Sequence, residues 1–442
     1  MRNKKIIFFG IKFLIFLSLV IAIYKGLEYI FVDDTESMTR IMFHDFYRQN
    51  IEIDTLFLGS SHIYRGIDAE AISAQTDKEC FDLAVGGQTL TSSYFLLKEA
   101  DKYYDIDTVY LEISPAVIRG GEFIDAYVIS DSMRSGLNKY QLIRVNLEQG
   151  KELNAFFPLC RAITTSNMDI QFNRTEIINR KRDSDYKKYG TKWLTDCTYD
   201  GRGSFLHTEE DNFSLWESVS SKSSDLHVVP DKFDKLQMQY VDKIIEECRK
   251  KDIDLTLFIM PFANLYTASQ TEDYEEMTAY WQQKAENSQI GFIDFNTISR
   301  NDMGLDENCF FDIDHMNGKG AGIFANCMAD YMNGTFPYQQ YNSVKERLEH
   351  ERGIYGVVYT TSMNESETYM DMNLEAVMNV DTVFYWEASV IDSEDQVLYQ
   401  FSPFSDIDNK TLKISCEYQE CRLQLKAMGE DDEELSVFNI QL

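Results

Sequence analysis

The sequence has few positive charges for its size, no close pair of cysteines, and no internal repeat or low-complexity tract. Its 442 residues include 42 lysines and arginines against 73 aspartates and glutamates, which gives a formal net charge of −31. This acidity argues against binding to nucleic acid, which needs a basic face, and against broad docking on an anionic membrane surface. The lack of a CxxC pair among the eight cysteines argues against a zinc ribbon or a thioredoxin motif.

What is present indicates a folded, exported chain. Hydrophobic residues make up 44% and aromatic residues 13% of the sequence, more than a disordered chain carries. The length is sufficient for more than one domain with a sizeable core. The simplest role of the excess negative charge is to keep the folded protein soluble.

Residues 1–33 are predicted to form a cytoplasmic tip and a membrane anchor. Arg2, Lys4 and Lys5 precede a largely apolar run from Ile6 to Val32. A helix of this length can cross a bilayer, and the basic flank favours a cytoplasmic N-terminus with the bulk of the chain outside. No small-x-small cleavage site follows, so we expect the helix to be retained. A cleaved signal peptide is the alternative, and it also exports the chain. A buried first helix fits the all-round apolar character less well.

Residues 34–345 are predicted to form an α/β domain, because apolar strand-like runs alternate with amphipathic helical runs. This alternation is typical of a parallel sheet with helices on both faces, and such sheets carry their sites at the carboxyl ends of the strands. The expected strands are 55–58, 80–85, 108–113, 255–260 and 290–294, and the expected helices include 90–104, 231–251 and 317–331.

Two further regions depart from this alternation. Residues 120–230 lack clear periodicity, and we expect them to form an ordered insertion that flanks the site. Residues 346–442 contain short strand-like runs separated by turn signals, which predicts a β-sandwich accessory domain.

Two short motifs supply a serine, an acid and a histidine. Gly59-Ser60-Ser61-His62 follows the first expected strand, and Asp312-Ile313-Asp314-His315 precedes a helix that Asn317 is expected to cap. Together they provide the minimum set for nucleophilic acyl chemistry. An aspartate three residues before a histidine can reach its ring on one turn. We therefore assign the acid to Asp312 and expect the adjacent Asp314 to be poorly placed.

The two motifs, in this order and on this scaffold, resemble the SGNH (GDSL-type) hydrolase superfamily over roughly residues 53–335. The resemblance implies a flavodoxin-like three-layer domain. It also implies that Ser61 is the nucleophile, that His315 is the general base and then acid, and that Asp312 orients His315. No metal and no cofactor are expected.

The resemblance also implies an oxyanion hole. Val85-Gly86-Gly87-Gln88-Thr89 resembles the second sequence block of the superfamily. Its glycine amide, matched to Gly87 with Gly86 as second choice, would join the amide of Ser61. The third block normally adds an Asn, but here the strand runs into Glu112-Ile113-Ser114-Pro115. Loss of one such donor typically costs about 100- to 1000-fold in rate.

The missing Asn, together with the N-terminal anchor and the Gly-Ser-Ser start, resembles the DltD-like and alginate-acetylation-like branches. Those proteins are membrane-tethered and extracytoplasmic, and they work beside membrane-bound O-acyltransferases that modify surface polymers. The resemblance therefore implies an acyl-ester hydrolase or O-acyltransferase acting on a cell-surface polysaccharide or teichoic-acid-like polymer.

Three residues near the motifs are candidate substrate contacts: His62, Arg65 and Glu112. The alternatives are packing or helix capping for His62 and an ion pair with Arg119 for Glu112. Two other functions stay open for the whole chain. One is a non-catalytic SGNH-like module that binds or assembles envelope polymer, which the missing Asn favours. The other is a metal-dependent hydrolase, whose ligands would be His62, Asp312, Asp314 and His315.

Overall fold

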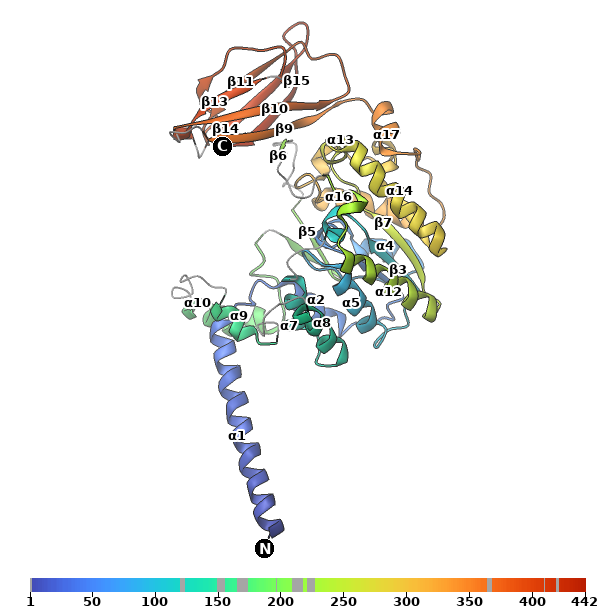
Figure 1. Ribbon diagram of the computed structural model, residues 1–442, viewed down its shortest axis with the longest axis vertical. Coiled ribbons are helices and arrows are strands. Elements are labelled where there is room, and N and C mark those ends of the chain that lie inside the picture. Colours follow the sequence, from blue (N-terminus) through green and yellow to red (C-terminus); the bar gives the residue numbers. More distant parts are fainter. Residues whose placement is uncertain are drawn as a thin grey trace. The chain divides into compact units, whose positions relative to one another are not determined.

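A computed structural model gives the fold (Figure 1). It describes residues 2–119, 124–148, 156–164, 174–195, 197–208, 218–220, 227–363, 368–408, 410–418 and 421–442. The chain divides into two compact units, Met1–Asn50 with Glu122–Thr198 and Ile51–Gly121 with Tyr199–Leu442. The parts of the predicted insertion between these ranges lie outside the described residues.

The first unit is helical and contains the predicted anchor. Its helices are α1 (Arg2–Phe31), α2 (Met38–Phe46), α7 (Ile124–Ser132), α8 (Leu137–Glu148), α9 (Pro158–Thr164), α10 (Arg174–Arg182) and α11 (Ser184–Lys187). Within the apolar span Ile6–Phe31 of α1, the most apolar window has a mean hydropathy of 2.8 and is not buried at all. Among the described residues α1 is the helix long and apolar enough to cross a membrane, although a signal sequence shares these properties.

The early part of the predicted insertion folds with this N-terminal segment. Helices α9 and α10 contact α1, and α7 contacts α2. Arg40 on α2 lies over the rings of Tyr186 and Tyr189, 4.0 and 4.6 Å from their centroids. The segment after α1 is therefore packed against later parts of the chain.

The second unit is built on a five-stranded parallel sheet, as the sequence predicts. Its strands are β1 (Thr55–Leu58), β2 (Cys80–Asp82), β3 (Thr108–Glu112), β7 (Asp254–Ile259) and β8 (Gly291–Asp294), in the order β2-β1-β3-β7-β8. The order reverses between β1 and β3. In open parallel sheets the carboxyl ends of the strands at such a reversal border the ligand crevice.

Two groups of helices cover the sheet. Helices α3 (Ser61–Gly66), α4 (Ala69–Gln75) and α16 (Gly318–Met332) pack together, and α5 (Leu90–Ala100) packs with α12 (Lys235–Lys251). From β1 the chain moves to one side of the sheet to reach β2 and to the other side to reach β3 and β7. Because the crossovers are right-handed, the two groups of helices lie on opposite faces of the sheet. Helix α12 begins later than predicted because the side chain of Asp234 caps it and Pro230–Lys232 forms a separate 3-10 turn. Asn317 caps α16 as predicted, accepting from the amide of Gly320 at 3.0 Å.

The remaining elements around the sheet are short except for α14. They are α6 (Pro115–Ile118), β4 (Thr198–Gly201), β5 (Ser204–Leu206), α13 (Asn264–Ala268), α14 (Thr271–Ser288), α15 (Arg300–Met303), α17 (Val344–His350), and the 3-10 turns Phe295–Thr297 and Glu307–Cys309.

The C-terminal region forms two four-stranded, mainly antiparallel sheets. Their strands are β6 (Ser218–Ser220), β9 (Ile354–Met363), β10 (Tyr369–Met378), β11 (Tyr385–Ile391), β12 (Val397–Gln400), β13 (Thr411–Ser415), β14 (Arg422–Met428) and β15 (Glu434–Gln441). The sheet orders are β13-β10-β9-β6 and β12-β11-β14-β15. Side chains from both sheets, including Leu412 and Trp386, share one hydrophobic core. This confirms the predicted sandwich.

The sequence signal for strand β10 is weak. In β10 the buried residues Met372 and Leu374 alternate with polar or acidic ones, and residues such as Asp371 and Glu375 have low strand propensity. Strand β6, from the predicted insertion, pairs with β9 in parallel.

Candidate active site

The predicted nucleophile lies on a tight turn at the end of β1. After Leu58, Gly59 and Ser60 reverse the chain, and Ser61 opens α3. Gly59 has no room for a side chain, because a Cβ there would collide with Glu112 and Ile63. Ser61 itself is only partly buried, whereas the rest of α3 is buried. The turn thus presents the Ser61 hydroxyl at the carboxyl edge of the sheet.

The structure brings Ser61, His315 and Asp312 together. The hydroxyl of Ser61 lies 2.7 Å from Nε2 of His315 and donates to it when the ring is neutral. Nδ1 of His315 donates to both carboxylate oxygens of Asp312 at 2.9 Å. Oδ1 of Asp312 also accepts from the amides of Asp314 and His315, at 3.0 and 2.7 Å. These contacts hold the segment as one compact turn, which positions the ring toward Ser61. A neutral imidazole with its proton on Nδ1 is the tautomer that a general base needs.

Asp314 also reaches the His315 ring, so the expectation that it would be poorly placed is wrong. Its Oδ1 lies 3.0 Å from Nδ1 of His315. The turn folds the side chain of residue 314 back beside the ring, and this side chain is 13% exposed against 40% for Asp312. The carboxylates of Asp312 and Asp314 therefore both face Nδ1 of His315. The contact of Asp314 could not be predicted, because spacing in the sequence does not show how the backbone of this turn folds.

The electrostatics of the cluster follow from these contacts. Burial opposes a charge on His315, but Asp314 and Asp312 outweigh it and raise the pKa of His315 to about 9. Burial likewise opposes a charge on Asp314. The adjacent His315 charge, with hydrogen bonds from His315 and His62, nevertheless holds the pKa of Asp314 well below its usual value. The site therefore favours a protonated His315 beside ionised Asp314.

The glycines predicted for the oxyanion hole lie on an exposed turn after β2. Gly87 has a φ of 65°, a conformation that glycine adopts without strain. The amide of Gln88 closes the turn by donating to the carbonyl of Val85 at 2.9 Å, and the amide of Val85 donates to the carbonyl of Gly59 at 3.4 Å. This last bond attaches the Gly86-Gly87 turn to the turn that carries Ser61.

The three candidate substrate contacts are buried, so their predicted role stays a prediction. The exposed fraction is 3% for His62, 5% for Arg65 and 0% for Glu112. A side chain buried to this extent mainly contacts the protein interior and leaves little surface for a large substrate. Glu112 accepts hydrogen bonds from the Ser60 amide, from the Ser60 hydroxyl at 2.9 Å, and from the Ser114 hydroxyl.

The ionic partner of Glu112 is His62, in place of the Arg119 weighed from the sequence. Nδ1 of His62 lies 2.6 Å from Oε1 of Glu112, and its Nε2 lies 3.1 Å from Oδ2 of Asp314. The topology supplies the signal that sequence reasoning missed. Because β1 and β3 are neighbours, the residues just after Leu58 must lie beside the residue that ends β3.

The ligand set weighed for a metal is partly assembled. His62, Asp314 and His315 each offer a ligand atom, and these atoms lie within 4.8 Å of one another. Three protein ligands are enough for catalytic zinc. In this cluster, however, each ring nitrogen has a hydrogen-bond partner, and Nε2 of His315 pairs with Ser61. A serine hydroxyl next to a histidine nitrogen is the arrangement that a serine nucleophile would need.

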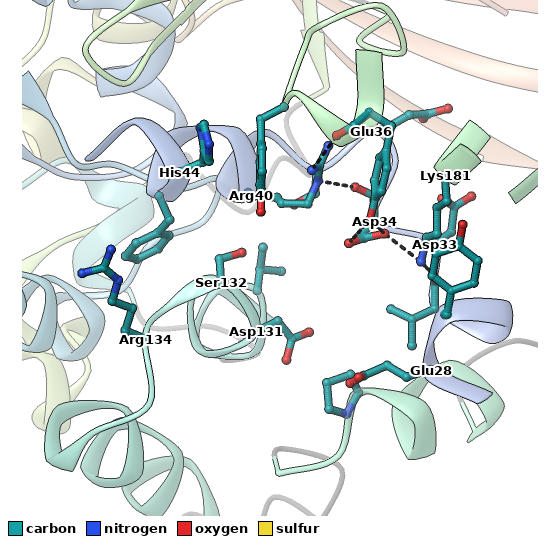
Figure 2. A pocket seen from close by; sticks show the side chains of 18 of the residues that line it. Glu28, Asp33, Asp34, Glu36, Arg40, His44, Asp131, Ser132, Arg134 and Lys181 are labelled. Carbon is teal, nitrogen blue, oxygen red and sulfur yellow. Dashed lines mark hydrogen bonds and ion pairs between the residues drawn. The ribbon is translucent and has the colours of Figure 1, made fainter. Parts of the chain in front are cut away.

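A separate cavity of about 980 Å³ lies in the first unit (Figure 2). Charged side chains of both signs line it, together with Tyr29, Tyr186 and Tyr189. Lys181 forms an ion pair with Asp34 at 2.8 Å on one side of the cavity. None of its lining residues belongs to the Ser61 cluster, so the cavity is distinct from the candidate active site.

Comparison of the sequence with protein-family models and with curated proteins finds no match. Solved structures with a similar fold include a protein described as an acylhydrolase from Bacteroides fragilis (10% identity, TM-score 0.30, 65% of this chain and 90% of that chain). A second is a GDSL-like lipase from Bacteroides thetaiotaomicron (9% identity, TM-score 0.31, 68% of this chain and 98% of that chain). A third is a protein described as a platelet activating factor from Streptococcus pneumonia (13% identity, TM-score 0.33, 71% of this chain and 99% of that chain). Identities and TM-scores as low as these assign no activity to this chain.

Proposed function

We propose that this protein is a serine-dependent acyl-ester hydrolase or O-acyltransferase of the SGNH type. The observation that carries the proposal is the 2.7 Å contact between the Ser61 hydroxyl and Nε2 of His315, whose Nδ1 faces two carboxylates. A serine hydroxyl becomes a useful nucleophile only when such a base can take its proton. The position of this pair at the reversal of the sheet order adds support.

The reaction begins when Oγ of Ser61 attacks the acyl carbonyl and His315 takes the hydroxyl proton on Nε2. The amides of Ser61 and Gly87 are the proposed donors to the resulting oxyanion. The intermediate collapses, the bond to the leaving oxygen breaks, and His315 returns its proton to that oxygen. Water or a hydroxyl of an acceptor then attacks the acyl-enzyme, again with His315 as the base. Exclusion of water decides between hydrolysis and transfer.

We further propose that the substrate is a cell-surface polysaccharide or teichoic-acid-like polymer. The apolar helix α1 and its basic flank support a location outside the cytoplasmic membrane. The cavity in the first unit, with charged and tyrosine side chains, offers a second surface that suits a polar polymer. A membrane-bound O-acyltransferase is the partner that such a reaction calls for, since it would supply the acyl group across the membrane.

The test is to treat the full-length protein in detergent with a fluorophosphonate and to measure the intact mass. One adduct is expected, and peptide mapping should place it on Ser61. Ser61→Ala and His315→Ala should both abolish it. The control Ser269→Ala, whose hydroxyl donates to the carbonyl of Tyr266, should be labelled like the wild type. Labelling that survives in Ser61→Ala, or that requires an added divalent metal, contradicts the proposal.

A non-catalytic binding module is the second candidate, and one observation favours it. Strand β3 ends in Glu112, and Glu112 and Ser114 are fully buried within the described structure. The sequence that follows β3, Ile113-Ser114-Pro115-Ala116, contains no Asn that could supply the third oxyanion donor of the superfamily. Absence of any phosphonate adduct, combined with retention on envelope polymer, would favour this candidate.

A further inference from the structure

His62 lies between two buried carboxylates, next to the proposed catalytic histidine. Its Nδ1 is 2.6 Å from Glu112, and its Nε2 is 3.1 Å from Oδ2 of Asp314. The other oxygen of Asp314, Oδ1, is 3.0 Å from Nδ1 of His315. The Asp314 carboxylate therefore bridges two imidazole rings whose centroids are 4.9 Å apart.

The two contacts of His62 require protons on both ring nitrogens, because ionised carboxylates only accept hydrogen bonds. Burial disfavours that charged form, but Glu112 and Asp314 outweigh burial and raise the pKa of His62 well above its ordinary value. The charge in turn helps to hold the pKa of the buried Glu112 below its usual value, against the effect of its own burial. Two buried carboxylates near each other would otherwise repel, so a positive ring between them stabilises both.

The groups that face His62 come from four elements. Glu112 ends β3, Ser60 precedes α3, and Asp314 and His315 belong to the turn before α16. The ring of Phe262, after β7, meets the imidazole edge to face, with centroids 5.4 Å apart. These neighbours leave His62 one orientation, with Nδ1 toward Glu112 and Nε2 toward Asp314.

We propose that His62 is a positioning residue for the serine chemistry described above: it donates to Glu112 and to Asp314 at once, and so fixes Asp314 against Nδ1 of His315. Glu112 anchors the chain of contacts, because the same carboxylate holds the Ser60 amide one residue before the nucleophile. The Glu112–His62–Asp314 chain thereby sets both the turn that carries Ser61 and the carboxylate that orients its base. The effect of His62 on the reactivity of Ser61 rests on the proposed function, whereas the protonation and contacts of His62 do not.

A first experiment reads the protonation of His62 directly. Full-length protein with ¹⁵N-labelled histidine is examined in detergent by NMR, and the six histidines are assigned by substitution. We expect His62 to keep protons on both ring nitrogens at pH 8, where a free histidine is neutral. In Glu112→Gln this doubly protonated signal should weaken or titrate at lower pH. A wild-type His62 that titrates near 6.5 overturns the proposal.

A second experiment is a double-mutant cycle on the rate of phosphonate labelling at Ser61. His62→Gln should lower this rate by about 100-fold, the typical cost of a small misplacement at a reacting centre. In the Asp314→Asn background the same change should cost less than about 3-fold, because the residue through which His62 acts has lost its role. In the Asp312→Asn background the full loss should remain. The control is His227→Gln, an exposed histidine paired with Asp273, which should label normally.

The outcomes separate this inference from the proposed function. Equal losses for His62→Gln in both backgrounds would show that it supports the fold and not Asp314, and would overturn the inference while leaving serine chemistry intact. An unlabelled wild type would overturn the proposed function, and the NMR experiment would still test the state of His62. If His62→Gln does not fold, His62→Asn takes its place in the cycle with the same expectations.

Discussion

The hydroxyl of Ser60 donates to Oε2 of Glu112 at 2.9 Å, and this bond joins the turn after β1 to the end of β3. The two residues are 52 positions apart in the sequence. Their contact depends on the strand order, which makes β1 and β3 neighbours, and on Gly59, which leaves the carboxylate room to approach. Glu112 is therefore central to the geometry of the site even though it does not face solvent.

Glu112→Ala is expected to be strongly destabilising. The change leaves the amide and hydroxyl of Ser60, the Ser114 hydroxyl and a charged His62 without their buried partner. Breaking a buried ion pair from one side typically costs about 3–5 kcal/mol. Denaturant unfolding of the full-length protein measures this change. Glu246→Ala is the matched control, because Glu246 forms only an exposed pair with Lys250 and should unfold like the wild type. Equal stability of the two variants would contradict the assigned role.

Asp312 and Asp314 are expected to share the orientation of His315. Since both carboxylates reach Nδ1, Asp312→Asn and Asp314→Asn should each lower the labelling rate of Ser61 by about 10- to 100-fold. The double variant should lose about 10⁴-fold, the cost seen when a serine triad loses its single acid. The measurement is the second-order rate of phosphonate labelling. A full 10⁴-fold loss in Asp312→Asn alone would show that Asp314 does not orient the base.

The reactivity of Ser61 is expected to rise with pH well beyond the range of an ordinary histidine. His315 accepts a proton only when neutral, which requires a pH above its pKa of about 9. The labelling rate should therefore be low below pH 7 and increase toward a midpoint near 9, not near 6.5. Removing either carboxylate weakens the attraction for the proton, so the midpoint should fall in Asp314→Asn. A wild-type midpoint near 6.5 would mean that the carboxylates do not hold the proton on His315.

Much of this architecture could be predicted because its signals are local. The strand at 55–58 is fully buried and reads as an apolar run, and the cap at Asn317 follows from its side chain. The Ser…Asp-x-x-His order could likewise be read directly, since Asp312 and His315 share one turn. These predictions held because neighbours in sequence decide the structure at these positions.

The remainder depends on contacts between distant segments. Nothing near His62 in the sequence shows that Glu112 and Asp314 lie on its two sides, since those partners are 50 and 252 positions away. An exposed role was therefore predicted for residues that are buried as a charged cluster. The backbone conformation of the 312–315 turn brings Asp314 to the His315 ring. The spacing in the sequence had predicted that Asp314 would be poorly placed for this contact.

The topology of the chain can be tested on intact cells. We expect Arg2, Lys4 and Lys5 to stay in the cytoplasm and the chain from Asp33 onward to lie outside, uncleaved, because a basic flank precedes the apolar span. External protease should then digest the bulk and leave a short anchor fragment that carries an N-terminal tag. Full protection of the bulk would contradict export, and loss of the tag before digestion would indicate a cleaved signal peptide.

The last prediction concerns the short oxyanion hole. With only the Ser61 and Gly87 amides as proposed donors, a small activated ester such as p-nitrophenyl acetate should be hydrolysed slowly, because it makes no remote contacts that hold the carbonyl in place. A large surface polymer can offset the missing donor through binding energy gained elsewhere. The charged and tyrosine-lined cavity of the first unit is the proposed surface for such contacts.

The experiment compares ester turnover with retention of the full-length protein on isolated envelope polymer. We expect weak turnover and clear retention, and we expect Tyr189→Ala to weaken retention, because the Tyr189 ring packs on Arg40 and on His44 along the cavity wall. Asp312→Asn should lower turnover without weakening retention, since it changes the base and not the cavity. Fast ester hydrolysis without polymer retention would identify an esterase of small soluble substrates, because no remote binding would then be needed to complete the hole.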